Sequence, residues 1–455
     1  MPELALGQGE CQTFASPPVP SPSVHRTGLA SATVTTSPPP LARRLGLGDA
    51  VTIGLGSMLG AGVFVSFAPA AAAAGAGLLV GLVVAAVVAV CNASSSAQLA
   101  VQHPSAGGTY VYGRAQLGEW PGFLAGWGFV VGKTASCAAM AMTVAAYAVP
   151  EPAQRPVAVL AVLVVAGVNL LGVTRTAAAA RVVVLVVLAV LAVVVAAGAT
   201  SGAPGLADAP LTVTGGWQGV LESAGLLFFA FAGYARIATL GEEVRDPRRT
   251  IPRAIFVALA VVLVVYALVA SSTVATLGAA ELARSDAPLV DVVVARGWDW
   301  AAPAVRAAAA VAALGALLAL VAGVGRTTLA MARTGDLPGW LAAVHPRRQV
   351  PHHAEIAVAV AVCALVLVAD LREVIGFSSA GVLFYYLVTN VAAWTQGDRF
   401  RLYARAWQVV GAVGCVVLVV SLPGSSLLGA AAVLLCGVVW RLVARRGRDR
   451  AQTTG

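Results

Sequence analysis

Long apolar runs recur along this 455-residue chain from about residue 50 to residue 443. A helix needs about 20 consecutive apolar residues to cross a bilayer, and only helices and closed barrels pair all their backbone polar groups there. Charged residues make up 11% of the chain, against about 25% in a soluble globular domain. The sequence therefore predicts an all-α polytopic membrane protein.

Division of the apolar runs at clusters of charge, proline and glycine gives about twelve transmembrane spans. They cover residues 48–74, 77–101, 121–148, 155–172, 180–200, 217–240, 252–276, 303–332, 354–370, 374–395, 406–422 and 425–443. Only Pro423 and Gly424 separate the last two, so their division is the weakest.

The distribution of arginine orients these spans. With a cytoplasmic N-terminus, every predicted cytoplasmic loop is basic, and the opposite side holds only Arg155, Arg284, Arg296, Arg306 and Arg372. Because cytoplasmic loops are enriched in Lys and Arg, we expect both termini inside and a location in the plasma membrane. The net charge of +9 then reflects topology and does not indicate a nucleic-acid partner.

Glycine interrupts two of the spans at related positions. The first span contains GSMLGAG, and the sixth contains Gly233 in mid-run, followed by polar and charged residues. Breaks at matching positions of two halves are typical of transporters built from inverted repeats. Since spans one and six open successive five-span units, and five is odd, the pattern predicts a five-plus-five inverted repeat.

This repeat defines the expected organisation of the chain. Residues 1–44 are rich in Ser, Thr and Pro and predict a disordered tail, or sequence upstream of the true start. The first five-helix repeat covers 45–201 and the second 202–396. Two peripheral helices occupy 397–443, and 444–455 form a basic cytoplasmic tail.

Unwinding near Ser57–Gly62 frees amides and carbonyls side by side within the first span. Together they suit a carboxylate and an ammonium, the two charged groups on the α-carbon of an amino acid. The alternative is that Gly56 and Gly60 form only a helix-packing face.

Five stretches of the chain resemble one family in the right order. They are GLGSMLGAGVF, HPSAGGTYVYGRAQLGEWPGFLAGW, NLLGV, FFAFAGYARIATLGEEVRDPRRTIPRAI and RTTLAMARTGDLP. Over about residues 45–395 the sequence resembles the amino acid–polyamine–organocation (APC) permeases, and among them bacterial relatives of cationic amino acid transporters. The resemblance implies a LeuT-type fold, alternating access and inward movement of amino acids, often coupled to protons.

The resemblance also implies a binding site. The substrate carboxylate would meet the backbone amides of Gly60, Ala61 and Gly62 and the hydroxyl of Ser57. Its ammonium would meet carbonyls near Met58, Phe229 and Ala232, beside Gly233. Phe229 or Phe231 would act as an aromatic lid.

Three intramembrane or near-membrane charges are candidates for coupling or gating. Arg236 follows Gly233 where related permeases often have an acid, which argues against a cationic substrate. Insertion of a lysine such as Lys133 at the bilayer centre costs about 3 kcal/mol of free energy. We hypothesise that it holds the span-one carbonyls and carries the coupling proton; the alternative is a packing strut. Three roles are open for Glu222. It is a candidate proton acceptor, a candidate gate residue, or a solvated acid at the start of a helix.

The predicted function is secondary active amino acid transport, and its coupling to protons is what the resemblance implies. Residues 307–325 of span eight contain no hydroxyl for a sodium site, which predicts that transport is sodium-independent. A polyamine or organocation transporter or exchanger, and a non-transporting sensor, are alternatives. Enzyme and pump motifs are missing, and no cofactor, metal or obligate protein partner is indicated. The expected partners are an amino acid, protons and membrane lipids. Whether the amino acid is cationic or neutral stays open.

Overall fold

The computed structural model describes residues 45–104, 107–172, 177–200 and 212–453. These ranges are mainly helical and contain no strand, only isolated bridges between Leu45 and Val244 and between Gly75 and Val213. The prediction of an all-α protein is therefore confirmed. The predicted disordered tail lies outside the described residues.

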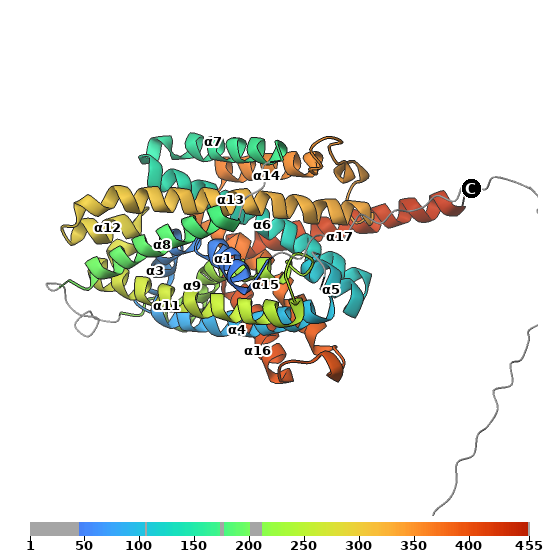
Figure 1. The fold of residues 1–455 in the computed structure, drawn as a ribbon, viewed down its shortest axis with the longest axis horizontal. Coiled ribbons are helices and arrows are strands. Elements are labelled where there is room, and N and C mark those ends of the chain that lie inside the picture. The colour runs from blue at the N-terminus through green and yellow to red at the C-terminus, as the bar shows by residue number, and fades with distance from the viewer. Residues whose placement is uncertain (1–44, 105–106, 173–176, 201–211, 454–455) are drawn as a thin grey trace, which may run out of the picture. The chain divides into compact units, whose positions relative to one another are not determined.

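The helices follow one another along the chain as shown in Figure 1. They are α1 (Leu47–Met58), α2 (Gly62–Val65), α3 (Phe67–Ala74), α4 (Leu78–Gln102), α5 (Gly108–Leu117), α6 (Glu119–Ala148), α7 (Glu151–Leu170), α8 (Ala177–Gly198), α9 (Gly216–Phe231), η1 (Ala232–Tyr234), α10 (Ala235–Ala238), α11 (Pro247–Leu282), α12 (Pro288–Ala295), η2 (Asp299–Ala301), α13 (Ala302–Arg333), η3 (Gly339–Ala342), α14 (His352–Val368), α15 (Leu371–Trp394), η4 (Asp398–Phe400), α16 (Arg405–Ser421) and α17 (Gly424–Thr453).

Within the described ranges, ten helical segments are long and apolar enough to cross a membrane. Two shorter apolar helices, α14 and α16, have 17 residues each, which is the lower limit for a span. Together these segments coincide with the twelve predicted spans. The chain is a multi-pass membrane protein, and the twelve-span inverted-repeat topology stays a prediction.

The structure differs from the sequence-based expectation at three places. Helices α5 and α12 lie in predicted loops, because a search for long apolar runs does not detect short or mixed-polarity helices. Helix α17 continues to Thr453, so most of the predicted basic tail is the polar end of a helix.

The helices differ strongly in how much of their surface is buried. In α6, 83% of the most apolar window is buried, and in the segment Gly216–Ala238 78%, against 22% in the span containing α8 and 17% in α17. Figure 1 shows α7 and α14 side by side, in agreement with their packing contacts. Spans three and six and helix α15, with 72% of its window buried, therefore lie mostly in the interior, whereas α8 and α17 leave most of their apolar surface exposed.

Candidate functional site

The first span is interrupted as predicted. Helix α1 ends at Met58, Leu59–Ala61 are not helical, and α2 begins at Gly62. Among the described residues, the amides of Gly60, Ala61 and Gly62 donate to no backbone or side-chain acceptor. The interruption thus leaves three consecutive N–H groups without a protein partner.

The sixth span is tightened and not unwound. Helix α9 ends at Phe231, the chain makes a 3₁₀ turn over Ala232–Tyr234, and helical conformation continues through α10. A 3₁₀ stretch within a longer helix often marks a hinge or a strained sequence. The break expected at Gly233 is therefore present only as this weaker distortion, which frees fewer backbone groups than the break in span one.

Gly233 brings the two distorted segments into backbone contact. A Cβ atom at this position would lie 2.5 Å from the carbonyl carbon and oxygen of Ser57 and 2.7 Å from the amide nitrogen of Met58. Gly62 is similarly close to Ala230, and Gly60 to Ala316. These glycines serve close packing as well as the interruption, so the helix-packing interpretation holds for them too.

Tyr266 of α11 satisfies the carbonyl freed at the end of α1. Its buried hydroxyl lies 2.5 Å from the carbonyl oxygen of Met58 and 3.0 Å from that of Ala230, so its single hydrogen is donated to Met58 or shared between the two. The ring packs against Phe231 at a centroid distance of 5.1 Å. Sequence reasoning missed this residue, although it is a lone tyrosine inside the apolar run of span seven.

Replacement of Tyr266 by phenylalanine is expected to lower the stability of the protein by about 1–3 kcal/mol, because buried carbonyls lose their donor. Unfolding in detergent micelles measures the effect. Tyr403→Phe is the matched control, since this half-buried hydroxyl makes no hydrogen bond to the described residues. Equal losses in the two variants would show that the Tyr266 hydroxyl does not support the junction.

Lys133 of α6 reaches the distorted segment of span six. Its Nζ donates to the carbonyl of Ala232 at 3.3 Å, and the hydroxyl of Tyr386 approaches the same oxygen at 3.5 Å. The lysine is 7% exposed. We expected it at the span-one carbonyls; the structure places it on span six instead, because the Met58 carbonyl is already bonded to Tyr266.

A cavity of about 260 Å³ lies against this junction. Its walls come from α1, α6, the turn formed by η1 and α10, and α13. Five of the predicted site residues line it, namely Ser57, Lys133, Ala232, Gly233 and Arg236. Pockets for drug-sized ligands occupy about 300–1,000 Å³, so this cavity suits a smaller solute.

The other predicted site residues lie outside the cavity wall. Phe231 packs on Tyr266, and the carbonyl of Phe229 accepts the amide of Ala232. Met58, Gly60, Ala61 and Gly62 are buried next to the cavity, with Gly60 against the cavity-lining Ala316.

Glu222 is remote from this group. Its carboxylate accepts a hydrogen bond of 2.7 Å from Arg372 of α15. Exposed pairs of this kind contribute about 0–1 kcal/mol. The contact favours a partly solvated acid over a role at the cavity.

A second cavity, of about 540 Å³, lies at the opposite ends of the core helices, on the side predicted to be extracellular. Val65, Pro69 and Met142 are among its lining residues. Beside its lining residues Val65 and Ala146, the Tyr147 hydroxyl donates to the carbonyl of Phe64 at 2.8 Å, and the two rings pack edge to face. These contacts fasten the segment after the interruption of span one to α6.

Sequence comparisons decide the family of this chain. A profile described as amino acid permease matches residues 45–439. The chain belongs to the amino acid permease family. The permease is 57% identical over 416 residues to an uncharacterized transporter of Mycobacterium tuberculosis, covering 90% of this chain and 94% of that protein.

More distant relatives have named substrates. A chloroplastic cationic amino acid transporter of Arabidopsis thaliana is 29% identical over 371 residues, 75% of the permease and 63% of that protein. A branched-chain amino acid permease of Bacillus subtilis is 25% identical over 375 residues, 77% and 80% of the two chains. All of these relatives are named as transporters or permeases. The names of the last two differ in the type of amino acid side chain, which is cationic in one and branched-chain in the other.

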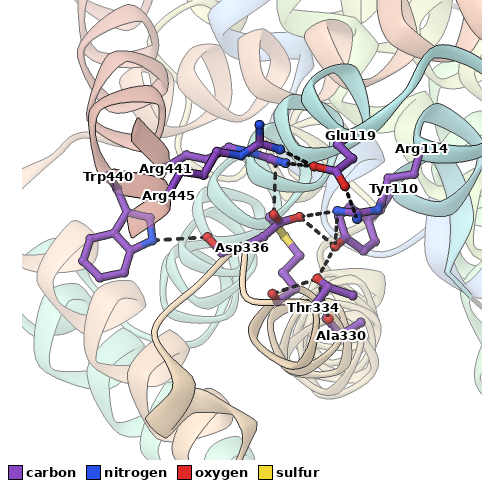
Figure 2. A network of polar contacts seen from close by, with 10 residues as sticks. Tyr110, Arg114, Glu119, Ala330, Thr334, Asp336, Trp440, Arg441 and Arg445 are labelled. Carbon is purple, nitrogen blue, oxygen red and sulfur yellow. Dashed lines mark hydrogen bonds and ion pairs between the residues drawn. The ribbon is translucent and has the colours of Figure 1, made fainter. Parts of the chain in front are cut away.

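A buried ionic cluster joins the permease's α5, the segment after α13 and α17 (Figure 2). The Asp336 carboxylate accepts hydrogen bonds of 2.8 Å from Tyr110 and from Arg114, and it pairs with Arg441 at 3.2 Å. The indole of Trp440 donates to the Asp336 backbone carbonyl. Arg441 is 2% exposed and Asp336 is 3% exposed, so each buried charge needs the other as its counter-ion.

Tyr110 connects this cluster with the cavity. Its side chain lines the cavity, while its hydroxyl also lies 2.5 Å from that of Thr334. Burial raises the pKa of the Tyr110 hydroxyl, which therefore stays protonated and able to donate to Asp336. The sequence analysis did not single out Tyr110, Asp336 or Arg441.

Proposed function

We propose that the permease is a secondary active transporter that moves amino acids across the cytoplasmic membrane by alternating access, with both termini cytoplasmic. One observation carries the proposal. The interrupted first span and the tightened sixth span meet at a cavity of about 260 Å³ that contains backbone and basic side-chain groups. Family membership supports transport, and the cavity supplies a place for a small polar solute.

The substrate would lie at the junction of the two spans. Its carboxylate would approach the unbonded amides of Gly60, Ala61 and Gly62 near Ser57, whose hydroxyl donates to Ile53 in the resting helix. Its ammonium would approach the Ala232 carbonyl beside Lys133, in place of the longer contact from the Tyr386 hydroxyl, since a carbonyl oxygen has two lone pairs. Phe229 or Phe231 would cover the bound substrate. The Met58 carbonyl would become an acceptor if Tyr266 released it, and the Phe229 carbonyl if the amide of Ala232 released it.

Alternating access would connect the two cavities in turn. The smaller one extends toward Arg326 and Thr327 near the predicted cytoplasmic end of α13, and the larger one lies on the side predicted to be extracellular. Rocking of the repeats 45–201 and 202–396 would open one side and close the other. The helices of 397–443 would stay peripheral.

Proton coupling without sodium fits the residues around span three. Residues 307–325 of α13 offer no hydroxyl ligand, and the ammonium of Lys133 occupies the Ala232 carbonyl. A desolvated ammonium that faces a cavity can release and regain a proton as the cavity changes sides. Lys133 would then carry the coupling proton.

Lys133→Gln separates this role from a packing role. Glutamine can still donate to the Ala232 carbonyl but cannot take up a proton. We expect the variant to lose accumulation driven by a proton gradient in proteoliposomes, while exchange at equal pH continues. Accumulation with wild-type rate and pH dependence would leave Lys133 as a packing strut.

Counterflow tests the proposed function itself. Proteoliposomes loaded with unlabelled amino acids should take up a trace of the labelled amino acid without any ion gradient. A thermal-shift screen with the twenty amino acids and polyamines would identify candidates beforehand. Thermal shifts without counterflow would favour the sensor alternative, and counterflow of polyamines alone would favour an organocation carrier.

A further inference from the structure

We propose that the cavity selects amino acids whose side chain carries a carboxylate. This inference rests on the proposed function and names the substrate class of the same site. The charged residues of the cavity wall are Lys133, Arg236, Arg326 and Glu243. Three are basic and one is acidic, so the wall has an excess of positive charge.

The basic groups follow the cavity from its inner end toward the junction. Arg326 is exposed on α13, Arg236 is half-buried on α10, and Lys133 is nearly fully buried on α6. Such a series of like charges attracts a counter-ion into a cavity with low-dielectric walls. An anionic group entering from this side would therefore meet a cation at each depth.

None of these three cations forms an ion pair with a carboxylate in the part of the chain that the structure describes. Lys133 donates to a backbone carbonyl and Arg236 to the hydroxyl of Thr239 at 3.3 Å. Arg236 feels both the repulsion of Arg326 and the attraction of Glu243. The buried carboxylate of Glu355 next to the wall attracts Arg326, so two carboxylates oppose three cations. A side-chain carboxylate of the substrate would balance the remaining positive charge.

The chemistry of the two arginines suits this ligand. A guanidinium presents N–H donors in a planar fork that matches the two oxygens of a carboxylate. The α-carboxylate and α-ammonium of the substrate would bind to backbone groups at the junction of the two spans. The side-chain carboxylate of aspartate or glutamate would then reach toward Arg236 and Arg326.

The same charges disfavour other classes of substrate. A lysine or arginine side chain, or a polyamine, would place a further positive charge among three others, opposed only by Glu243 and Glu355. Like charges brought together at a binding site discriminate against the wrong ligand. A neutral side chain would avoid repulsion but would form no ion pair with either guanidinium group.

Competition in counterflow tests this selectivity with defined probes. For the full-length wild type in proteoliposomes, we expect L-glutamate or L-aspartate to be taken up at least tenfold faster than L-lysine, with L-leucine in between. The double variant Arg236→Gln/Arg326→Gln should reduce uptake of the acidic amino acid relative to leucine at least tenfold. Arg333→Gln, an exposed position on the same helix outside the cavity wall, should leave that ratio unchanged.

The possible outcomes separate this inference from the function on which it rests. Uptake of lysine or leucine without uptake of acidic amino acids would overturn the inference and leave amino acid transport standing. An equal loss for all substrates in the double variant would assign the arginines to a gate and also overturn it. No counterflow with any amino acid would remove both proposals. If the double variant does not fold, wild-type competition alone decides.

Discussion

Replacement of Asp336 by alanine is expected to lower the free energy of unfolding by about 3–5 kcal/mol. The carboxylate is nearly fully buried, accepts hydrogen bonds from Tyr110 and Arg114, and forms an ion pair with Arg441. Without it, the guanidinium of Arg441 stays buried over the rings of Trp120 and Phe123 with no carboxylate at comparable depth. An unpaired buried charge is among the most costly defects in a folded protein.

Two further variants isolate the cause of that loss. Asp398→Ala removes the acid of an exposed ion pair with Arg401 and should cost about 0–1 kcal/mol. Adding Arg441→Met to Asp336→Ala should restore part of the stability, because methionine keeps the aromatic contacts and removes the buried charge. Unfolding in mixed detergent micelles compares all of them. A loss in Asp336→Ala no larger than in Asp398→Ala would contradict the burial argument.

Gly233→Ala is expected to abolish counterflow and to lower the melting temperature. The added methyl group would lie 2.5 Å from backbone atoms of Ser57, and backbone cannot move aside as a flexible side chain can. Overpacking of this kind costs about 1–3 kcal/mol, and here it separates the two spans that form the cavity.

Gly323→Ala is the matched control for this prediction. Gly323 lines the same cavity on α13, and a Cβ atom there meets nothing within 4 Å. The substitution should preserve stability or raise it by about 0.5–1 kcal/mol, since alanine is the better helix former. Equal behaviour of the two variants would mean that close contact at Gly233 is not required.

Much of the fold follows from sequence patterns that have direct physical causes. The apolar runs predict the ten long apolar segments and the shorter helices α14 and α16 of the described residues, because a bilayer requires long apolar helices. The glycines around Gly60 predict the interruption of span one. Lys133 stands out because it is the sole lysine of the chain and lies inside an apolar run. These features depend on residues that are close together in the sequence.

The remaining features depend on contacts between distant segments. No local pattern shows that Tyr266 bonds the Met58 carbonyl, and the sequence alone therefore offers Met58 as a free acceptor. The prediction that Lys133 holds span one fails for the same reason. From the sequence, Asp336 looks like an ordinary charged residue of a loop, and Arg441 looks like one of the basic residues at the C-terminal end of the chain. Only the packing of α17 brings them together.

Cysteine accessibility tests the central claim most directly, namely that substrate occupies the cavity between the interrupted spans. In a background without the six native cysteines, Ser57→Cys should react with a membrane-impermeant thiol reagent in inside-out vesicles. The amino acid that drives counterflow should slow this reaction, whereas labelling of Arg333→Cys should not change. A Ser57→Cys thiol that does not react from the cytoplasmic side, or reacts equally fast with and without that amino acid, would contradict the claim.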